Sequence, residues 1–282
     1  MRTTLFSILL SFWFLVSGQN NLQNYTPSIL FDKGDWEFKT FQNFYTQTKS
    51  FDDSESKVDN GVRETFFTSI NQFLYGINDQ INVGVDVWVK ASNNDSDEFS
   101  TSAGISGFGP RIKVAPIKSL PRLSLQSTYL FNVLDDPEGA EGTRYFLEWD
   151  ANLWLNQIFF DLPLSTKSQL FFQQAFWYRF AKDGSSAENN FLETQTSIFY
   201  SYFPTSRWTI YAMSEYFPRH YDFNEQKVEA FFSYFVQSGL GIKYQLIPNL
   251  IELEALYTNF WLGSEGQGAG ETLNLGIRVI RQ

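Results

Sequence analysis

The sequence predicts an all-β protein, a closed antiparallel up-and-down transmembrane β-barrel of about twelve strands. The first sign is an alternation that gives a strand one apolar and one polar face. The apolar face carries Ile81, Val83, Val85, Val87 and Val89, and the other face carries Asn82, Gly84, Asp86, Trp88 and Lys90. Such a strand fits either a soluble core or a barrel wall whose apolar side meets lipid. Ring content and loop lengths favour the barrel.

Aromatic residues are unusually abundant for a soluble core. The 282 residues include 30 Phe, 14 Tyr and 8 Trp, together 18% of the chain, although the mean hydropathy is only -0.26. Membrane barrels carry aromatic girdles at both interfaces. The rings expected in these girdles lie near predicted strand ends: Trp36, Phe131, Tyr178, Tyr202, Trp208 and Trp261.

Composition disfavours several classes of function. The chain has no Cys, which excludes disulfides and thiolate metal sites, and its single His leaves little scope for His-based metal binding. The formal net charge of -10 disfavours nucleic acid as a partner. We expect no cofactor and no metal.

The N-terminus predicts an export signal over residues 1–18. Arg2 precedes an apolar run from Leu5 to Val16, and Val16-Ser17-Gly18 offers small residues for cleavage. The run has about 12 residues, short of the roughly 20 that a membrane-spanning helix needs. We expect residues 19–33 to form a periplasmic N-terminal segment and residues 34–282 the transmembrane barrel. No other segment approaches a spanning helix, so the mature chain would enter a membrane only as a closed barrel.

Twelve alternating segments are predicted as strands, most of them longer than the usual soluble strand of about 5–6 residues. They lie near residues 34–48, 63–75, 80–91, 104–116, 121–133, 143–156, 168–180, 190–203, 206–217, 228–246, 249–261 and 271–281. The last strand carries the apolar stripe Leu273, Leu275, Ile277 and Val279, which resembles the C-terminal signal of outer-membrane barrels. The chain departs from that signal by ending on Gln282 rather than an aromatic residue.

Short turns and long polar loops alternate along the chain, as in barrels with short periplasmic turns and longer external loops. Turns are expected at 76–79, 117–120, 204–205 and 247–249, and loops at 49–62, 92–103, 181–189 and 262–270. Segment 157–167 should be a short turn but is long. It either carries a small plug or continues a strand. A periplasmic or extracellular β-sandwich or β-clam is the soluble alternative, which loop asymmetry and strand length disfavour.

If the apolar stripe of each strand faces lipid, most charged side chains of the strands point into the lumen. Arg or Lys on the lipid face would cost about 2–4 kcal/mol at mid-depth, which supports this assignment. The candidate lumen-lining residues are Asp86, Trp88, Lys90, Arg111, Lys113, Arg144, Glu148, Asp150, Trp177, Arg179, Glu215, Glu229, Glu252, Glu254 and Arg278.

The lumen groups have two interpretations, which the sequence leaves open. They form a polar path for solutes, or they form a lattice of ion pairs that fills a narrow lumen. The nearly equal numbers of acidic and basic groups would suit the lattice. Rings expected inside are either an apolar binding track or the packing of a plug: Phe41, Tyr45, Phe67, Trp88, Phe146, Trp154, Phe171, Trp177, Phe231 and Phe235.

One pair of residues raises the alternative of an enzyme. His220 and Asp222, expected in a loop at the barrel rim, make a minimal proton-transfer pair. No Ser lies two positions after His220 to supply a nucleophile motif. We therefore expect an ordinary surface His, no catalytic residues and no enzyme.

Three stretches carry a family resemblance. Leu74–Gly84, Gly107–Lys113 and Gly239–Leu250 resemble hairpins and a glycine-led strand of the MetA-pathway-of-phenol-degradation barrels, a transporter-type outer-membrane family with members in Bacteroidota. The resemblance implies an outer-membrane channel, with hydrophobic or aromatic compounds among its solutes. No binding residue is carried over from the family.

The sequence thus predicts an outer-membrane channel of a Gram-negative bacterium, for passive or facilitated passage of small solutes. Its expected partners are outer-membrane lipid, the barrel assembly machinery during insertion, and the solutes. The leading alternative is a closed structural or interaction barrel with a plugged lumen. A rim-located hydrolase is third.

Overall fold

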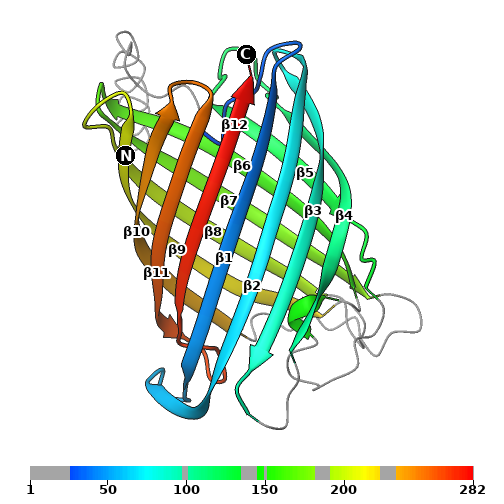
Figure 1. The fold of residues 1–282 in the computed structure, drawn as a ribbon, viewed down its shortest axis with the longest axis vertical. Helices are drawn as coiled ribbons and strands as arrows, with labels where there is room; N and C mark the ends of the chain where they lie inside the picture. The colour runs from blue at the N-terminus through cyan, green and yellow to red at the C-terminus, as the bar shows by residue number, and fades with distance from the viewer. Residues whose placement is uncertain are drawn as a thin grey trace, which may run out of the picture.

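The computed structural model describes residues 26–96, 101–134, 145–148, 151–181, 191–222 and 233–281. Its twelve strands form a closed antiparallel barrel in the order β1-β12-β11-β10-β9-β8-β7-β6-β5-β4-β3-β2 (Figure 1). The last strand pairs with the first, from Trp36 opposite Arg281 to Thr46 opposite Glu271, so the sheet closes on itself. The predicted fold class is confirmed.

Each strand and its neighbour along the chain make an antiparallel pair. The strands are β1 (Trp36–Phe51), β2 (Lys57–Asn78), β3 (Ile81–Asn94), β4 (Ser102–Val114), β5 (Leu123–Leu130), β6 (Ala151–Ser165), β7 (Ser168–Ala181), β8 (Phe191–Tyr202), β9 (Trp208–Asp222), β10 (Ser233–Ile247), β11 (Ile251–Gly263) and β12 (Glu271–Arg281). A short 3₁₀ helix, η2 (Tyr145–Leu147), precedes β6.

The two ends of the barrel differ. At one end, here called the turn end, β1 begins, β12 ends and the even strands connect to their successors; it is at the top of Figure 1. The opposite end, here called the loop end, holds the connections that follow the odd strands. Among the described residues, no helix is long and apolar enough to cross a membrane.

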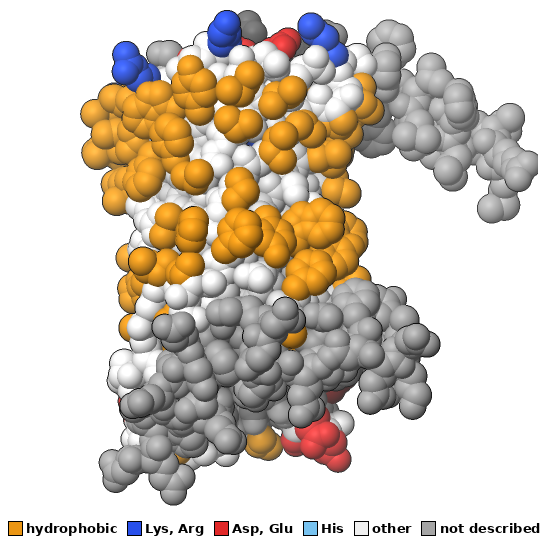
Figure 2. Space-filling view, turned by 90° about the vertical axis from the view of Figure 1, so that its right-hand side faces the viewer, with side chains coloured by type: hydrophobic (Ala, Val, Ile, Leu, Met, Phe, Trp, Pro, Cys, Tyr) orange, Lys and Arg blue, Asp and Glu red, His pale blue; other side chains and the backbone are white. Residues whose placement is uncertain are grey.

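Side chains alternate between the outer face and the lumen. Along β3, the Val85 side chain is 53% exposed whereas its neighbour Asp86 is fully buried. Figure 2 shows hydrophobic side chains spread over the barrel wall, with Lys and Arg at the rim of the turn end. Four of the predicted girdle rings are exposed on this outer surface: Phe131, Tyr202, Trp208 and Trp261.

The first hairpin is longer than predicted. The ladder of β1 and β2 continues through the expected loop 49–62, with Lys49 opposite Asp59 and Phe51 opposite Lys57, so that only residues 52–56 connect the strands. A strand that extends beyond an apolar belt has water on its outer face and loses its hydrophobic alternation. The backbone hydrogen bonds continue there, but the alternation of apolar and polar residues that would predict a strand does not.

The predicted strand 143–156 is shifted. The structure starts β6 at Ala151 and continues it to Ser165, which pairs with Ser168 of β7. Segment 157–167 is therefore mostly strand: the continuation of a strand is confirmed, and a plug within this segment is wrong.

The faces of β6 are also reversed from the prediction. Trp154, expected in the lumen, is 41% exposed on the outside, whereas Leu153 and Leu155 are buried inside. They pack there with Trp88 and Leu130. The assignment failed because this sector of the lumen is itself apolar, so the apolar stripe does not mark the outer face. A shift of one residue reverses the face of every side chain on a strand.

Phe67 is a second ring with the wrong predicted face. It lies against the exposed Phe44, with ring centroids 4.8 Å apart and the rings tilted, while its neighbour Phe66 lies against Tyr45 and Phe146. Two adjacent Phe residues leave the choice of face open in the sequence, because either ring continues an apolar stripe.

Candidate functional site in the barrel lumen

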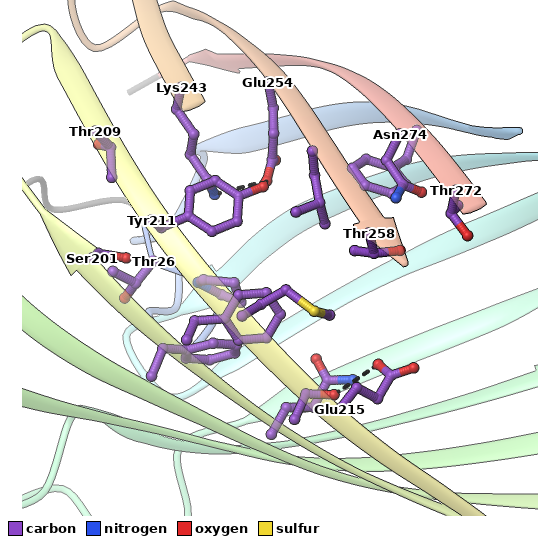
Figure 3. Close-up of a pocket in the computed structure, with 18 of the residues that line it drawn as sticks. Thr26, Ser201, Thr209, Tyr211, Glu215, Lys243, Glu254, Thr258, Thr272 and Asn274 are labelled. Atoms are coloured by element: carbon purple, nitrogen blue, oxygen red, sulfur yellow. Dashed lines mark hydrogen bonds and ion pairs between the residues drawn. The ribbon is translucent and has the colours of Figure 1, made fainter. Parts of the chain in front are cut away.

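A cavity of about 350 Å³ lies inside the barrel, here called the central cavity. Its wall is built from β1 and from β7 to β12, and Thr26 and Pro27 of the N-terminal segment also line it. Rings, amides, hydroxyls and a few charged groups alternate around this wall (Figure 3). The volume falls at the lower end of the roughly 300–1,000 Å³ usual for small-molecule sites.

Aromatic and aliphatic side chains form one part of this wall. The Phe199 ring lies 5.4 Å from that of Phe171 and 6.0 Å from that of Tyr211, measured between centroids. Met213 and Leu256 pack against Tyr211 in the same cluster. These side chains offer an apolar surface to a solute, while each comes from a strand whose other face is directed outward.

Gly241 makes room for the Tyr211 ring. A Cβ at position 241 would lie 2.2 Å from Cζ of Tyr211, far inside van der Waals contact. With this space, the Tyr211 hydroxyl donates to Oε1 of Glu254 at 2.6 Å. The Lys243 ammonium lies 3.4 Å from the same carboxylate oxygen. The Glu254 carboxylate at this side of the cavity thus has both a hydroxyl donor and a counter-charge.

Glu215 occupies another part of the wall, apart from Lys243, Tyr211 and Glu254 (Figure 3). Its side chain is almost fully buried, as the residue is 7% exposed. Three neutral groups donate hydrogen bonds to its carboxylate: the Gln237 amide at 2.7 Å, the Ser197 hydroxyl at 2.9 Å, and the Gln195 amide.

The N-terminal segment lies within the turn end of the lumen. The backbone of Phe31 makes a pair of 2.8 Å hydrogen bonds with the side-chain amide of Asn82, which is fully buried. The Lys113 ammonium donates to the carbonyl oxygens of Pro27 and Ile29, each at 2.6 Å. A smaller cavity of about 160 Å³ is lined by these three segment residues and by the barrel wall.

Two further contacts hold this segment. The hydroxyls of Thr26 and Ser28 donate to the carboxylate of Asp161, which is 3% exposed. Near the rim, Gly76 exchanges backbone hydrogen bonds with Gly34 and Asp35. A Cβ on Gly76 would lie 2.0 Å from the backbone oxygen of Asp32, so only glycine permits this close approach.

A chain of ion pairs crosses the lumen toward the loop end. Glu148 lies 2.9 Å from the Lys90 ammonium of β3 and also pairs with Arg179 of β7. Arg179 lies 2.7 Å from Glu193, which in turn pairs with Arg219. Because β3 and β7 are not neighbours in the barrel, Glu148 bridges its interior.

The structure describes twelve of the fifteen predicted lumen residues; Arg144, Asp150 and Glu229 lie outside the described residues. Glu148 was predicted on a strand, but it follows η2 in a left-handed turn with φ of 56°. Eight of the described residues make ion pairs with one another or with Glu37, Glu193 or Lys243: Asp86, Lys90, Arg111, Glu148, Arg179, Glu252, Glu254 and Arg278. The Trp88 ring lies beside the Lys90 ammonium, and Trp177 packs edge-on against Trp88. Lys113 holds the N-terminal segment, and Glu215 lines the central cavity.

Several residues of the lumen were missed from the sequence. Asn82 and Asp161 bind the N-terminal segment, while Gln195 and Gln237 bind Glu215. A signal for Asn82 was present, because it lies on the polar face of the clearest alternating strand. Gln195 and Gln237 alternate with apolar residues too weakly to be singled out.

No metal site is assembled in the part of the chain that the structure describes, and the predicted proton-transfer pair lies on a strand. No group of three or more His, Cys, Asp or Glu there could hold a metal ion. His220 and Asp222 lie within β9, not in a loop as expected.

In fold, the chain is similar to solved bacterial outer-membrane β-barrels. The COG4313 outer membrane channel from Pseudomonas putida F1 superposes with a TM-score of 0.68 at 9% identity, over 92% of this chain and 100% of that chain. The beta domain of the Bordetella autotransporter Brka gives a TM-score of 0.55 at 8% identity, over 88% and 99%. No protein-family model and no curated protein matches the sequence.

Proposed function

We propose that this chain is an outer-membrane channel for passive or facilitated passage of small solutes. The observation that carries the proposal is the central cavity, whose wall mixes polar groups and rings inside a barrel with an apolar outer surface. A barrel that served only as a membrane anchor would fill its lumen with side chains. The fold likeness to a solved outer-membrane channel supports the same function.

The proposed setting is the outer membrane of a Gram-negative bacterium, reached by export, cleavage near Gly18 and insertion by the barrel assembly machinery. The exposed apolar side chains on all sides of the barrel support a lipid environment. Membership of the MetA-pathway-of-phenol-degradation family, an origin in Bacteroidota and a periplasmic position for residues 19–33 stay predictions.

Hydrophobic or aromatic compounds are proposed among the solutes. The cluster of Phe171, Phe199, Tyr211, Met213 and Leu256 supports this, because it offers an apolar surface to a solute in the central cavity. The predicted polar path and apolar track are therefore both parts of one proposed route.

Reconstitution tests the channel. The purified mature protein is inserted into planar bilayers for conductance and into liposomes for swelling in small sugars and small aromatic alcohols. We expect discrete conductance steps and solute entry. A barrel that shows heat-modifiable gel mobility, and is thus inserted and folded, yet gives neither conductance nor swelling, overturns the proposal.

A closed structural or interaction barrel is the second candidate. It is favoured by the two obstructions of the lumen, the segment 26–31 near the turn end and the chain of ion pairs toward the loop end. In that case bilayer conductance is absent in the wild type and stays absent when either obstruction is removed. Nothing among the described residues favours the rim hydrolase, and the protein is proposed not to be an enzyme.

A further inference from the structure

We infer that the central cavity binds solutes that carry a protonated amine on an apolar or aromatic body, and that Glu215 receives the amine. This inference rests on the proposed channel function and specifies which solutes its lumen retains. Glu215 has no basic partner among the described residues, its hydrogen-bonding neighbours have a fixed orientation, and an apolar wall lies beside it.

Glu215 differs from the other carboxylate of the central cavity. Glu254 has the Lys243 ammonium 3.4 Å away, whereas no Lys or Arg among the described residues lies within ion-pair distance of Glu215. The carboxylates in the chain of ion pairs toward the loop end are also paired, as in Glu148 with Lys90. Asp161 likewise accepts from neutral hydroxyls, but the N-terminal segment covers it. Burying a carboxylate without a counter-charge is costly, so the open position beside Glu215 favours a cation.

The neighbours of Glu215 are oriented to hold a carboxylate. The carbonyl oxygen of Gln195 accepts from the Trp177 indole at 3.1 Å, and that of Gln237 accepts from the Thr258 hydroxyl at 2.6 Å. Each amide therefore directs its NH₂ group toward Glu215. Both carboxylate oxygens of Glu215 therefore face amide N–H donors whose orientation is set by a further hydrogen bond.

The hydrogen bonds leave Glu215 room for one more donor. A carboxylate offers about four lone-pair positions. Oε2 accepts from Gln195 and Ser197, and Oε1 accepts only from Gln237. An ammonium entering from the cavity would donate a second hydrogen bond to Oε1. This bond would be charge-assisted and therefore stronger than a neutral one.

The apolar wall of the cavity favours a solute whose body, apart from the amine, is apolar or aromatic. Phe199, Tyr211, Met213 and Leu256 line the same cavity and accommodate an aromatic or aliphatic body, with ring faces that also favour a nearby cation. The positive groups of the cavity lie elsewhere: Lys243 is paired with Glu254, and Lys39 stands on β1, separated from β9 by β10, β11 and β12. The amine is thus directed to Glu215 rather than to the other side of the cavity.

Calorimetric titration of the mature protein in a non-ionic detergent tests this inference. The probes are 2-phenylethylamine and 2-phenylethanol, which share a body and differ in the charged group. We expect the amine to bind more tightly than the alcohol. Glu215→Gln should weaken amine binding about tenfold or more, as loss of a charge-assisted hydrogen bond does, and leave alcohol binding unchanged. Glu215→Asp should keep the preference for the amine.

The matched control is Glu252→Gln. It removes the same charge from a lumen carboxylate that pairs with Arg278 and does not line the central cavity. Amine binding should survive this change. Equal affinity of the wild type for both probes overturns the inference, and so does equal weakening by Glu252→Gln and Glu215→Gln, which would indicate bulk charge alone. The wild-type comparison needs no variant to fold.

The two proposals fail separately. A barrel that conducts and swells liposomes but does not prefer the amine refutes the amine site and leaves the channel. A barrel that binds the amine with the expected dependence on Glu215, but passes neither ions nor solutes, refutes the channel and leaves the site.

Discussion

Asp86 and Arg111 show how charges are kept inside the barrel. Asp86 is fully buried and Arg111 is 7% exposed, and their side chains pair between the adjacent strands β3 and β4. Oδ2 of Asp86 also accepts from the Gln72 amide at 3.2 Å and the Trp88 indole at 3.4 Å. Such a pair gains little over apolar packing, but removing one member leaves an uncompensated buried charge.

Asp86→Asn is expected to lower the free energy of unfolding by roughly 3–5 kcal/mol, because it leaves Arg111 buried without its counter-charge. Urea titration of the barrel in detergent measures the change. Asp79→Asn is the control, since its pair with Lys118 at 3.5 Å is exposed on both sides. Exposed pairs contribute about 0–1 kcal/mol. Similar losses for both variants would contradict the burial argument.

Gly241→Ala is expected to destabilise the barrel by about 1–3 kcal/mol, the usual range for overpacking. The cause is the Tyr211 ring, whose Cζ lies 2.2 Å from the position of the new Cβ. A double-mutant cycle with Tyr211→Ala tests the cause, because the penalty should nearly vanish once the ring is gone. An equal penalty in both backgrounds would assign the effect to the backbone instead.

At the scale of elements, the described part of the N-terminal segment behaves as an inserted strap. Asn82 and Lys113 bind its backbone rather than its side chains. Phe31 alone adds an apolar anchor, packed with Leu74 and Ile280. The hydroxyls of Thr26 and Ser28 also bind Asp161. Backbone contacts impose few demands on sequence, and these two hydroxyls form no regular pattern, so residues 26–31 carry no sequence signal that predicts insertion.

Lys113→Met is expected to raise the conductance of the reconstituted barrel, because it removes the donor to the carbonyls of Pro27 and Ile29 and loosens the strap. Deleting residues 26–31 should raise it further. The readout is single-channel conductance in planar bilayers. Lys118→Met, an exposed lysine in the connection after β4, is the control. Conductance unchanged by the deletion would show that the strap does not limit passage.

At the scale of the whole molecule, the closed sheet separates two surfaces. The outer one exposes Val85, Ile105, Leu240 and Trp261, each at least half exposed. The inner one buries Asp86, Lys90 and Glu193. This distribution is inverted relative to a soluble protein, and it is stable only where lipid covers the outside.

Val85→Arg is expected to destabilise the lipid-inserted barrel by about 2–4 kcal/mol, the cost of Arg near mid-depth on a lipid-facing strand. Ile117→Arg should cost only about 0–1 kcal/mol, because Ile117 lies in the connection between β4 and β5 and not on a strand of the barrel wall. Urea titration in vesicles measures both. Equal tolerance of the two substitutions, with a protein that stays soluble without detergent, would refute the membrane setting.

The sequence by itself determined the number of strands, the identity of most of their outward faces and most of the charged residues inside. It could do so because a strand has a period of two, and residues Ile81 to Lys90 display that period without reference to any other part of the chain. Strand ends were less certain, since alternation fades in β1 and β2 before pairing does.

Only the tertiary structure decided what fills the lumen. The inward face of β6, the crossing of the lumen by Glu148 and the insertion of the segment at Phe31 all depend on side chains that are distant in sequence. The same holds for the setting of Glu215, whose donors come from β8 and β10. Local alternation fixes which way a side chain points, but closure of the barrel fixes what it meets.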